Sequence, residues 1–586
     1  MQAFGNRRLL WGMVLVWLGL LAGLVLLSGC VVSAEEDGEK MSDAEVEIKG
    51  LEDQGIRANP YRAGRSMTMS QHGIVASSHV LASQAGLDVL RSGGSAMDAA
   101  VATAATLTVV EPMMTGIGGD VWILYYEAKT GKVHALNGSG KSPANLTRDY
   151  FAKKEEQRIE SNSWEAVTVP GAVDAYSTAL ERFGRKSLGE VLQPAIRYAS
   201  EGFPVTEIVA NAWKGAETGL RRDPWARKTW LVDDQAPAES AIFKNPNLAE
   251  SLKLIAKGGR DAFYKGPIAE EIVRYASESE GFLSLEDFAR HSSEWVDPIS
   301  TNYRGFDVFQ CPPNGQGIGV LMMLNILESY DLSKMRHNSP EYLHLLIEAK
   351  KLAYADLGKH VADPWQSDVP TQGLLSKAYA AERRKLIDPE RAAPTVEPGT
   401  PQNGDTIYLS VIDSEGNAAS FINSLFSSFG SKIVGGKTGI TLQNRGSGFT
   451  LEAGHINEYA PGKRPFHTII PGMVTKDGKL YMSYGLMGGA MQPQGHVQFL
   501  LSHLEFGLNI QQANDVPRWR HMSGMRVLME HGTPLETMQA LIRMGHEIDP
   551  SGGGSFGGAQ TIMVHPVTGT FLGGSDPRKD GAALGY

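Results

Sequence analysis

Hydrophobic and polar positions along the chain follow two different periods, which predict a mixed chain of helices and strands. Residues 82–90 and 96–109 have helical spacing, and the second segment is rich in alanine, which suits close packing under a sheet. Glycines at 93–94 end the first helix, and Pro112 follows the second. Strand-like runs lie at 73–76 and 121–126.

The middle of the chain is predicted to be helical. Ser339 is a good N-cap, and Pro340 fits the first helical position. The apolar residues that follow recur with a period near 3.6: Leu345, Leu346, Ala349, Leu352 and Ala353. This stripe is interpreted as core and not as a site.

The pattern changes most sharply between residues 391 and 405, where proline and glycine are frequent and apolar periodicity is absent. Such a stretch is typical of an exposed linker. Strands are predicted immediately after it, at 407–412 and 418–422, with a turn between them. Later strands (473–474, 479–484, 561–564) and helices (494–506, 534–544) complete an α/β (α+β) pattern without an internal repeat.

Composition narrows the possible partners. Hydrophobic residues make up 42% of the chain and the formal net charge is -10, with a pI near 5.9. A globular composition with this acidic balance argues against nucleic acid as a partner. The cysteines and histidines have no zinc-type spacing, so no metal or other cofactor is expected.

The first 30 residues differ from the rest. Arg7 and Arg8 precede an apolar run at 9–27, and Ser28, Gly29 and Cys30 follow it. This order is typical of a secretory signal, and its end resembles the lipobox of bacterial lipoproteins, in which the cysteine carries the lipid. An uncleaved membrane anchor and a simple cleaved signal are the alternatives.

All three interpretations place the body outside the cytoplasm. The favoured one is a membrane-tethered lipoprotein of the cell envelope, facing the periplasm or the exterior. Residues 31–64 are polar and acidic and are predicted to be a tether. Lipidation of Cys30 would leave Cys311 alone, so no disulfide framework is expected.

The junction between the linker and the strand at 407–412 carries the strongest chemical signal. A threonine hydroxyl is a weak nucleophile unless a base lies beside it. A cut between Asp405 and Thr406 would free the α-amine of Thr406, which could then act as that base. From these residues alone, a plain turn entering a strand is the alternative.

Short motifs along the chain resemble the γ-glutamyltranspeptidase family in their order and spacing. In the second part of the chain they are Gly404-Asp405-Thr406, Phe429-Gly430, Pro461-Gly462-Lys463-Arg464-Pro465 and Met487-Gly488-Gly489. In the first part they include Gly116-Ile117-Gly118-Gly119, Val169-Pro170-Gly171 and Glu348-Ala349-Lys350. The resemblance covers nearly all of the chain after the tether.

The resemblance implies a four-layer αββα N-terminal-nucleophile fold that is made as a proenzyme and cuts itself. The cut would give a large subunit, 65–405, and a small subunit, 406–586. Thr406 would attack a γ-glutamyl amide, form an acyl-enzyme and pass the acyl group to water or an amine.

The resemblance also assigns supporting residues. Gly488 and Gly489 match the glycines whose backbone N–H groups stabilise the oxyanion, and a tight turn is the alternative. Ser424 matches a threonine whose hydroxyl supports the nucleophile.

The chain departs from the family pattern where the substrate is recognised. Ser139 replaces an arginine that binds the α-carboxylate of the glutamyl group, and His467 and Thr468 replace a pair of serines that helps it. In the segment Gln443-Asn444-Arg445-Gly446-Ser447-Gly448, Arg445 replaces a glutamine that receives the α-amino group, and Gly448 replaces an aspartate with the same role.

Arg445 would repel a substrate ammonium and attract a carboxylate. The expected substrate therefore carries an acid group near the scissile amide, without an obligatory α-ammonium. Pairing of Arg445 with a structural acid is the alternative. This pattern of replaced residues is similar to that of a divergent branch of the family, which includes oxamate amidohydrolase and cephalosporin-acylase-like proteins.

Three functions remain. The first is a γ-glutamyltransferase or glutathione hydrolase, and the second is an amidohydrolase of the same fold for another acidic acyl amide. The third is an inactive surface scaffold, against which the presence of Thr406, Ser424 and Gly488–Gly489 argues.

Overall fold

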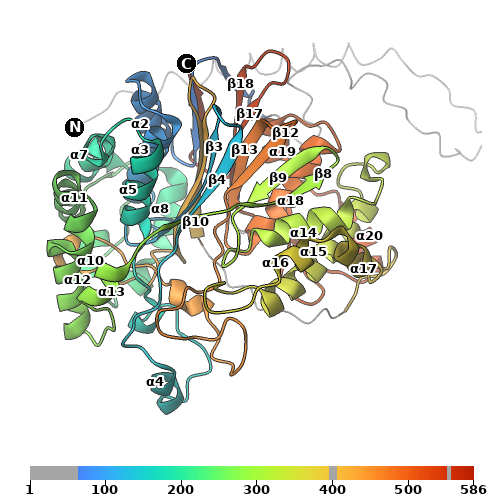
Figure 1. Ribbon diagram of the computed structural model, residues 1–586. Coiled ribbons are helices and arrows are strands. Elements are labelled where there is room, and N and C mark those ends of the chain that lie inside the picture. Colours follow the sequence, from blue (N-terminus) through green and yellow to red (C-terminus); the bar gives the residue numbers. More distant parts are fainter. Residues whose placement is uncertain (1–63, 395–404, 551–555) are drawn as a thin grey trace, which may run out of the picture. The chain divides into compact units, whose positions relative to one another are not determined.

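Two facing β-sheets form the centre of the molecule. The structure, a computed structural model, describes residues 64–394, 405–550 and 556–586. Each sheet has seven strands, and helices cover the outer face of each, so that the order of layers is αββα (Figure 1). This four-layer arrangement was predicted and is confirmed.

The first sheet contains the strand that begins at the linker. β10 (Asp405–Ile412) is hydrogen-bonded to β2 (Ile74–Ser77) on one side and to β11 (Ala418–Phe426) on the other, both antiparallel. Outside them lie β19 (Ala582–Gly585) next to β2, and β3 (Asp120–Glu127), β4 (Lys132–Gly138) and β7 (Glu294–Val296) beyond β11.

The second sheet is also antiparallel. Its central strand is β13 (Lys479–Met487), paired with β17 (Gly558–Val564) and β12 (Gly472–Lys476). The outer strands are β1 (Thr68–Ser70) and β18 (Phe571–Ser575) at one edge and β9 (Phe306–Gln310) and β8 (Ile299–Tyr303) at the other.

Alternation along β10 decides which side chain enters which layer. Ile407, Leu409 and Val411 belong to the core under the first helical layer, whereas Tyr408 and Ile412 belong to the core between the sheets. Successive side chains of a strand point to opposite faces, so both faces of β10 are buried. This explains why the strand reads as an almost continuous apolar run in the sequence.

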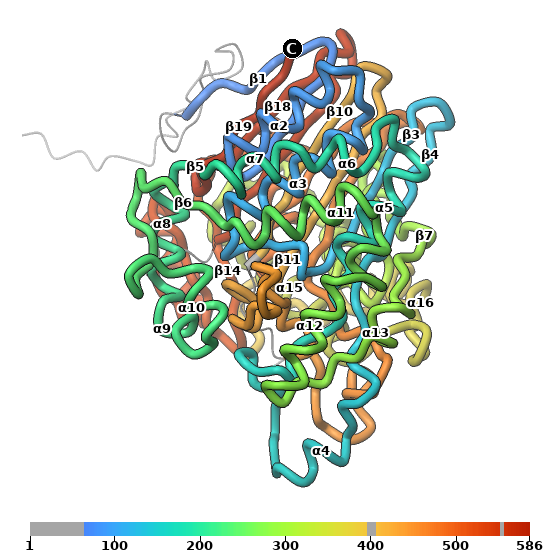
Figure 2. Tube along the Cα trace, turned by 90° about the vertical axis from the view of Figure 1, so that its left-hand side faces the viewer, coloured from blue at the N-terminus to red at the C-terminus, as the bar shows by residue number. Residues whose placement is uncertain are grey.

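Long helices cover the first sheet, and Figure 2 shows them in front of it. The alanine-rich α3 (Ala96–Val110) is buried along its whole length, as its composition predicts, and a capping box of Ser95 and Asp98 starts it. The layer also includes α2 (Val80–Arg91), α5 (Ala172–Phe183), α7 (Gln193–Glu201), α11 (Pro246–Tyr264) and α12 (Pro267–Glu278).

A second helical layer covers the other sheet. α15 (Pro340–His360) is capped by Ser339, as predicted, and packs on α14 (Ile318–Leu327). The other members are α18 (Met491–Leu504) and α19 (Ile510–Asp515), with α16 (Thr371–Leu375), α17 (Lys377–Arg384) and α20 (Leu535–Arg543) at the periphery.

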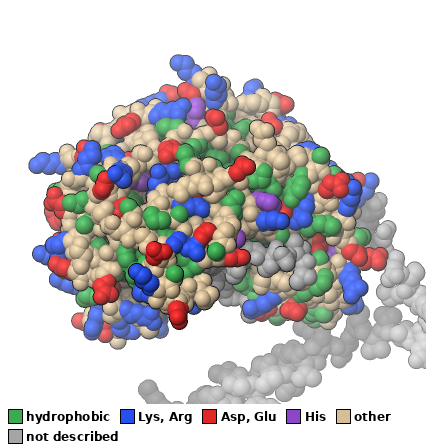
Figure 3. All heavy atoms as spheres, turned by 60° about the horizontal axis from the view of Figure 1, so that its bottom comes forward, with side chains coloured by type: hydrophobic (Ala, Val, Ile, Leu, Met, Phe, Trp, Pro, Cys, Tyr) green, Lys and Arg blue, Asp and Glu red, His purple; other side chains and the backbone are tan. Residues whose placement is uncertain are grey.

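The predicted signal at 1–30, with Cys30, and nearly all of the predicted tether lie outside the described residues, so lipidation and the envelope location stay predictions. Within the described ranges, no helix combines the length and the apolar character needed to cross a bilayer. On the face shown in Figure 3, basic and acidic side chains are interspersed.

Candidate active site

Thr406 lies at an irregularity near the start of β10. Asp405 is opposite Phe426 of β11, whereas Ile407 is opposite Asn423, so the register shifts at Thr406. Such a bulge re-aims a side chain and is frequent beside active sites. Thr406 is almost completely buried. The side chain of Asp405 is outside the described part of the structure.

The hydroxyl of Ser424 is the partner of Thr406. The two side-chain oxygens are 3.1 Å apart, and either hydroxyl can be the donor. The Ser424 oxygen also accepts a hydrogen bond of 2.8 Å from the N–H of Phe426. This contact fixes the serine rotamer, and with it the position of the hydrogen bond to Thr406.

The glycine-rich loop before β3 packs directly on Ser424. A Cβ atom added to Gly119 would lie 2.2 Å from the carbonyl oxygen of Ser424, which is closer than any side chain can approach. The second position of this motif is constrained in the same way, since a Cβ on Gly118 would meet the carbonyl oxygen of Thr441. The loop therefore holds β11 in place at its active-site end.

β13 of the second sheet faces β10. The hydroxyls of Ser410 and Ser483 are 2.9 Å apart, and Gly485 lies against the ring of Tyr408. These two contacts show that β10 and β13 run in opposite directions. The end of β13, which Gly488 and Gly489 follow, therefore lies towards Thr406. The sequence motifs of the two segments thus meet across the space between the sheets.

Gly488 and Gly489 form the turn between β13 and α18. Their φ angles are 121° and 57°, in the region that favours glycine. Among the described residues, no acceptor is found for either N–H group. The side chain of Gln316 donates to the carbonyl oxygens of Gly489 (2.9 Å) and Thr468 (2.6 Å), which fixes the orientation of the turn.

A cavity of about 470 Å³ adjoins this centre. Phe426, opposite Asp405, lines it, and so does Ala490, which follows Gly489. Much of the wall is apolar or aromatic, and the polar positions are mostly uncharged. The apolar lining consists of Tyr354, Leu357, Val361, Phe426, Phe449, Phe466 and Ala490.

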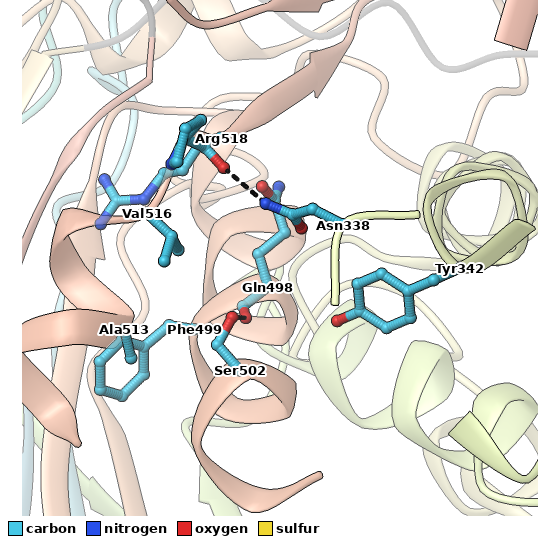
Figure 4. A pocket seen from close by; sticks show the side chains of 9 residues that line it. Asn338, Tyr342, Gln498, Phe499, Ser502, Ala513, Val516 and Arg518 are labelled. Carbon is cyan, nitrogen blue, oxygen red and sulfur yellow. Dashed lines mark hydrogen bonds between the residues drawn. The ribbon is translucent and has the colours of Figure 1, made fainter. Parts of the chain in front are cut away.

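A second cavity, between α15, α18 and the segment at Val516–Arg518, is shown in Figure 4. Its volume is about 10 Å³, which is room for no more than one water molecule. It lies among Gln498, Ser502 and Ala513 and contains none of the predicted site residues. It is therefore not a substrate site.

Arg445 is fully buried and only partly satisfied. Its Nη1 donates to Thr468 Oγ1 at 2.8 Å, and its guanidinium lies over the ring of Phe426, 4.4 Å from the centroid. In the described structure, Nε and Nη2 have no hydrogen-bond partner and the side chain has no ion pair. The pairing with a structural acid that the sequence left open is thus not found there.

His467 is buried behind Thr468 and contacts Asp120. Its Nε2 is 3.0 Å from Asp120 Oδ2, and neither side chain is exposed. Burial lowers the pKa of His467 to about 4, with Arg445 adding to this effect and Asp120 opposing it. The ring is therefore neutral at pH 7 and supports the segment that carries Thr468.

Ser139 and Asn444 are buried in the surrounding shell and do not line the cavity. Ser139 Oγ donates to Asn137 Oδ1 at 2.6 Å. Asn444 accepts a hydrogen bond from the N–H of Ser427 at 3.1 Å and donates to the carbonyl of Ser161 at 3.0 Å. Both residues hold loops, and Thr468 is the predicted substrate contact that reaches the cavity.

Asp120 is a residue that sequence reasoning missed. Besides His467, it accepts hydrogen bonds from the N–H of Gly140 (2.9 Å) and from Gln443 Nε2 (2.8 Å). It thereby joins segments on both sides of the predicted cut. Its position as a lone acid between a glycine-rich loop and an apolar strand was the available signal. Gln316 was missed as well.

Three side chains far from Thr406 in the sequence could hold a cation. His344, Glu348 and His546 place ligand atoms within 4.8 Å of one another. Most of these atoms are engaged with one another or with Lys351: His344 Nδ1 contacts His546 Nε2 at 2.9 Å, and Lys351 Nζ lies 2.8 Å from Glu348 Oε1. The ammonium of Lys351 supplies the positive charge that a metal ion would bring.

Comparison with known proteins agrees with this geometry. A family model described as gamma-glutamyltranspeptidase matches residues 82–586. The chain belongs to this family. The predicted family resemblance is confirmed, and with it the assignment to the N-terminal-nucleophile amidohydrolases.

Relatives of this γ-glutamyltranspeptidase-family chain differ in their named activities. The glutathione hydrolase-like YwrD proenzyme of Bacillus subtilis is 42% identical over 522 residues, which cover 87% of this chain and 98% of the relative. The oxamate amidohydrolase proenzyme of Klebsiella pneumoniae is 33% identical over 536 residues, covering 89% and 100%.

A solved structure, cephalosporin acylase from Bacillus halodurans, is 41% identical with a TM-score of 0.86, covering 90% of this chain and 98% of that one. The family and the hydrolase class are thereby established, whereas the substrate differs among the relatives.

Proposed function

We propose that the chain is a proenzyme cut between Asp405 and Thr406, and that the free N-terminal Thr406 is the nucleophile of an acyl-amide hydrolase or transferase. The observation that carries the proposal is the buried Thr406–Ser424 hydroxyl pair, 3.1 Å apart, at a bulge beside the cavity. The proenzyme names of the relatives support the processing step.

The reaction would follow from this arrangement. The α-amine of Thr406 takes the proton from Oγ1, which attacks the amide carbonyl. The N–H groups of Gly488 and Gly489, for which no acceptor is found among the described residues, would stabilise the oxyanion of the tetrahedral intermediate. Collapse breaks the C–N bond, the leaving amine takes the proton, and an ester to Thr406 remains. Water or a second amine then attacks this ester and releases Thr406.

Two substrate classes fit this chemistry. The glutathione hydrolase-like name of one relative supports γ-glutamyl amides, including glutathione. The named amidohydrolase and acylase relatives support another acidic acyl amide, and so does Arg445, which has no ion pair among the described residues. Both classes use the same nucleophile, so the processing experiment tests the shared mechanism first.

Thr406→Ala and Thr406→Ser variants, purified beside the wild type, test the proposal. Intact mass should show two fragments for the wild type and for the serine variant, with residue 406 at the new N-terminus. The alanine variant should remain one chain and lack amidase activity. A wild-type chain that stays uncut, or an alanine variant that is cut at the same bond, would refute the proposal.

A further inference from the structure

The turn between β13 and α18 has little of its own to hold it in place. Gly488 and Gly489 carry no side chains, and a glycine backbone samples more conformations than that of any other residue. The turn lies directly before α18, where the first N–H groups of a helix lack acceptors within it. Because oxyanion donors act only when they are oriented in advance, this turn needs restraint from other segments.

Tyr354 of α15 supplies one such restraint. Its hydroxyl donates a hydrogen bond to the carbonyl oxygen of Ala490, which directly follows the two glycines and is the N-cap residue of α18. Burial raises the pKa of Tyr354, so the hydroxyl remains protonated and stays a donor at neutral pH. Tyr354 also lines the cavity of about 470 Å³. One side chain therefore contacts both the turn and the cavity.

The ring of Tyr354 is itself held in place. Lys350, one turn earlier on α15, places Nζ 3.9 Å from the ring centroid. His521 Nε2 lies 2.9 Å from the carbonyl oxygen of Gly524, which can only accept, so His521 Nδ1 is the acceptor of the 2.8 Å hydrogen bond from Lys350 Nζ. A lysine that is fixed in this way backs the ring and limits its movement.

Gln316 restrains the same turn from a different segment. Its Nε2 donates to the carbonyl oxygens of Gly489 and Thr468, and the residue lines the same cavity. The consecutive carbonyls of Gly489 and Ala490 are thus each bound by a side chain from outside the turn. Because a peptide group is planar, a fixed carbonyl fixes the whole group, which limits the freedom of the glycines before it.

We propose, building on the function above, that Tyr354 is a positioning residue of the hydrolysis, whose hydroxyl acts together with Gln316 to hold the Gly488–Gly489 turn in the orientation that receives the oxyanion. The hydroxyl acts through Ala490 and does not touch the reacting atoms. The ring has the separate role of a cavity wall. Loss of the hydroxyl should therefore lower kcat, whereas loss of the ring should also raise KM.

Steady-state kinetics of Tyr354→Phe, Gln316→Met and Tyr354→Leu separate these roles, with glutaryl and γ-glutamyl p-nitroanilides as substrates. The first two variants should lower kcat by about 10-fold with little change in KM, because small displacements of a catalytic group are costly. Tyr354→Leu, which removes the ring as well, should also raise KM. An unchanged kcat in Tyr354→Phe would overturn the inference and leave the proposed function intact.

Two matched controls come from the small cavity in Figure 4, which is lined by Tyr342 and Gln498. Tyr342 is a buried tyrosine about 18 Å earlier along α15. Gln498 Nε2 donates to the carbonyl oxygens of Gln494 (3.1 Å) and Trp519 (2.9 Å), much as Gln316 bridges two carbonyls. Tyr342→Phe and Gln498→Met should leave kcat unchanged. An equal fall in kcat in these controls would assign the effect to general destabilisation and overturn the inference.

Hydrogen–deuterium exchange tests the restraint without turnover. In Tyr354→Phe, the amides of residues 486–491 should exchange about 2- to 10-fold faster than in the wild type, and the two controls should match the wild type. If Tyr354→Phe does not fold, Gln316→Met gives the same comparison. Equal exchange in a cut, active enzyme would overturn this inference alone, whereas an uncut wild-type chain would refute the proposed function and this inference with it.

Discussion

The pair of hydroxyls at Thr406 and Ser424 places two nucleophilic oxygens where water has little access. Before any cut, Thr406 has no free α-amine, and the hydroxyl of Ser424, 3.1 Å away, can share its proton. After a cut, the amine would take the role of base and Ser424 that of orientation. One serine would thus serve two successive reactions with different demands.

Ser424→Ala should slow self-cleavage and lower kcat, by about 10-fold or more, because Thr406 loses its orienting partner. The N–H of Phe426 would also lose its acceptor, at a cost of about 1–3 kcal/mol in stability. Fragment formation over time and steady-state kinetics measure the two effects.

Ser420→Ala is the matched control for Ser424, since Ser420 is a buried hydroxyl on the same strand that bonds to Tyr408 and the carbonyl of Gly472. It should destabilise the protein without changing kcat. Ser424→Thr, which keeps the hydroxyl, should restore processing. Normal processing in Ser424→Ala would contradict the assigned role.

Sequence motifs predicted Thr406 as the nucleophile and Gly488 as an oxyanion glycine, because these two roles have few chemical alternatives. The structure brings their segments together, and the roles themselves stay predictions. Asp120 and Gln316 were not predicted, since their importance depends on partners brought from distant segments by the fold. The family resemblance predicted that Ser139 contacts the substrate, but its hydroxyl donates a hydrogen bond to Asn137.

At the scale of elements, the site is built from the ends of two strands in different sheets. β10 supplies Thr406 at its start, and β13 supplies the glycine turn at its end. The pattern of apolar residues located both strands, but it does not contain the order of strands in the sheets. That order depends on long-range pairing. β10 pairs on one side with β11, which follows it in the sequence, and on the other side with β2, which precedes it by more than 300 residues.

Gly488→Ala should lower kcat by about 100-fold with little change in KM, because a displaced N–H no longer meets the oxyanion. With φ at 121°, and with Gly557 Cα and Met491 Cβ 3.2 Å from an added Cβ, the alanine is strained and crowded. Steady-state kinetics and denaturant unfolding measure both consequences.

Gly478 provides a matched control for Gly488. It lies in the β12–β13 hairpin with φ of 73°, and a Cβ there meets nothing within 4 Å. Gly478→Ala should cost about 1 kcal/mol or more of stability through backbone strain alone, and it should leave kcat unchanged. A similar fall in kcat for both variants would remove the support for an oxyanion role.

For the molecule as a whole, several buried histidines are held neutral. Burial lowers the pKa of His79 and His291 to about 4, that of His467 to about 4, and that of His496 to about 3. These folded-state values lie below the ordinary value of about 6.5, which the unfolded chain retains. Between these values, the unfolded chain binds more protons than the folded one.

Stability should therefore fall as pH decreases from about 6.5 towards 4, with each such histidine contributing up to about 2 kcal/mol by pH 5. Urea unfolding midpoints at pH 7.5 and pH 5.0 measure the slope. His496→Asn, which removes one of these groups, should give a flatter dependence than the wild type. Identical midpoints at the two pH values would contradict this account.

The carbonyl of Tyr586 accepts hydrogen bonds from the N–H groups of Gln71 (3.3 Å) and His72 (2.9 Å), so the last residue lies beside the first strands of the body. A short peptide could join these two regions in a circular permutant. If the gene were reopened at residue 406, removal of the initiator methionine would leave threonine as the first residue. Maturation by self-cleavage and catalysis could then be studied as separate properties of one fold.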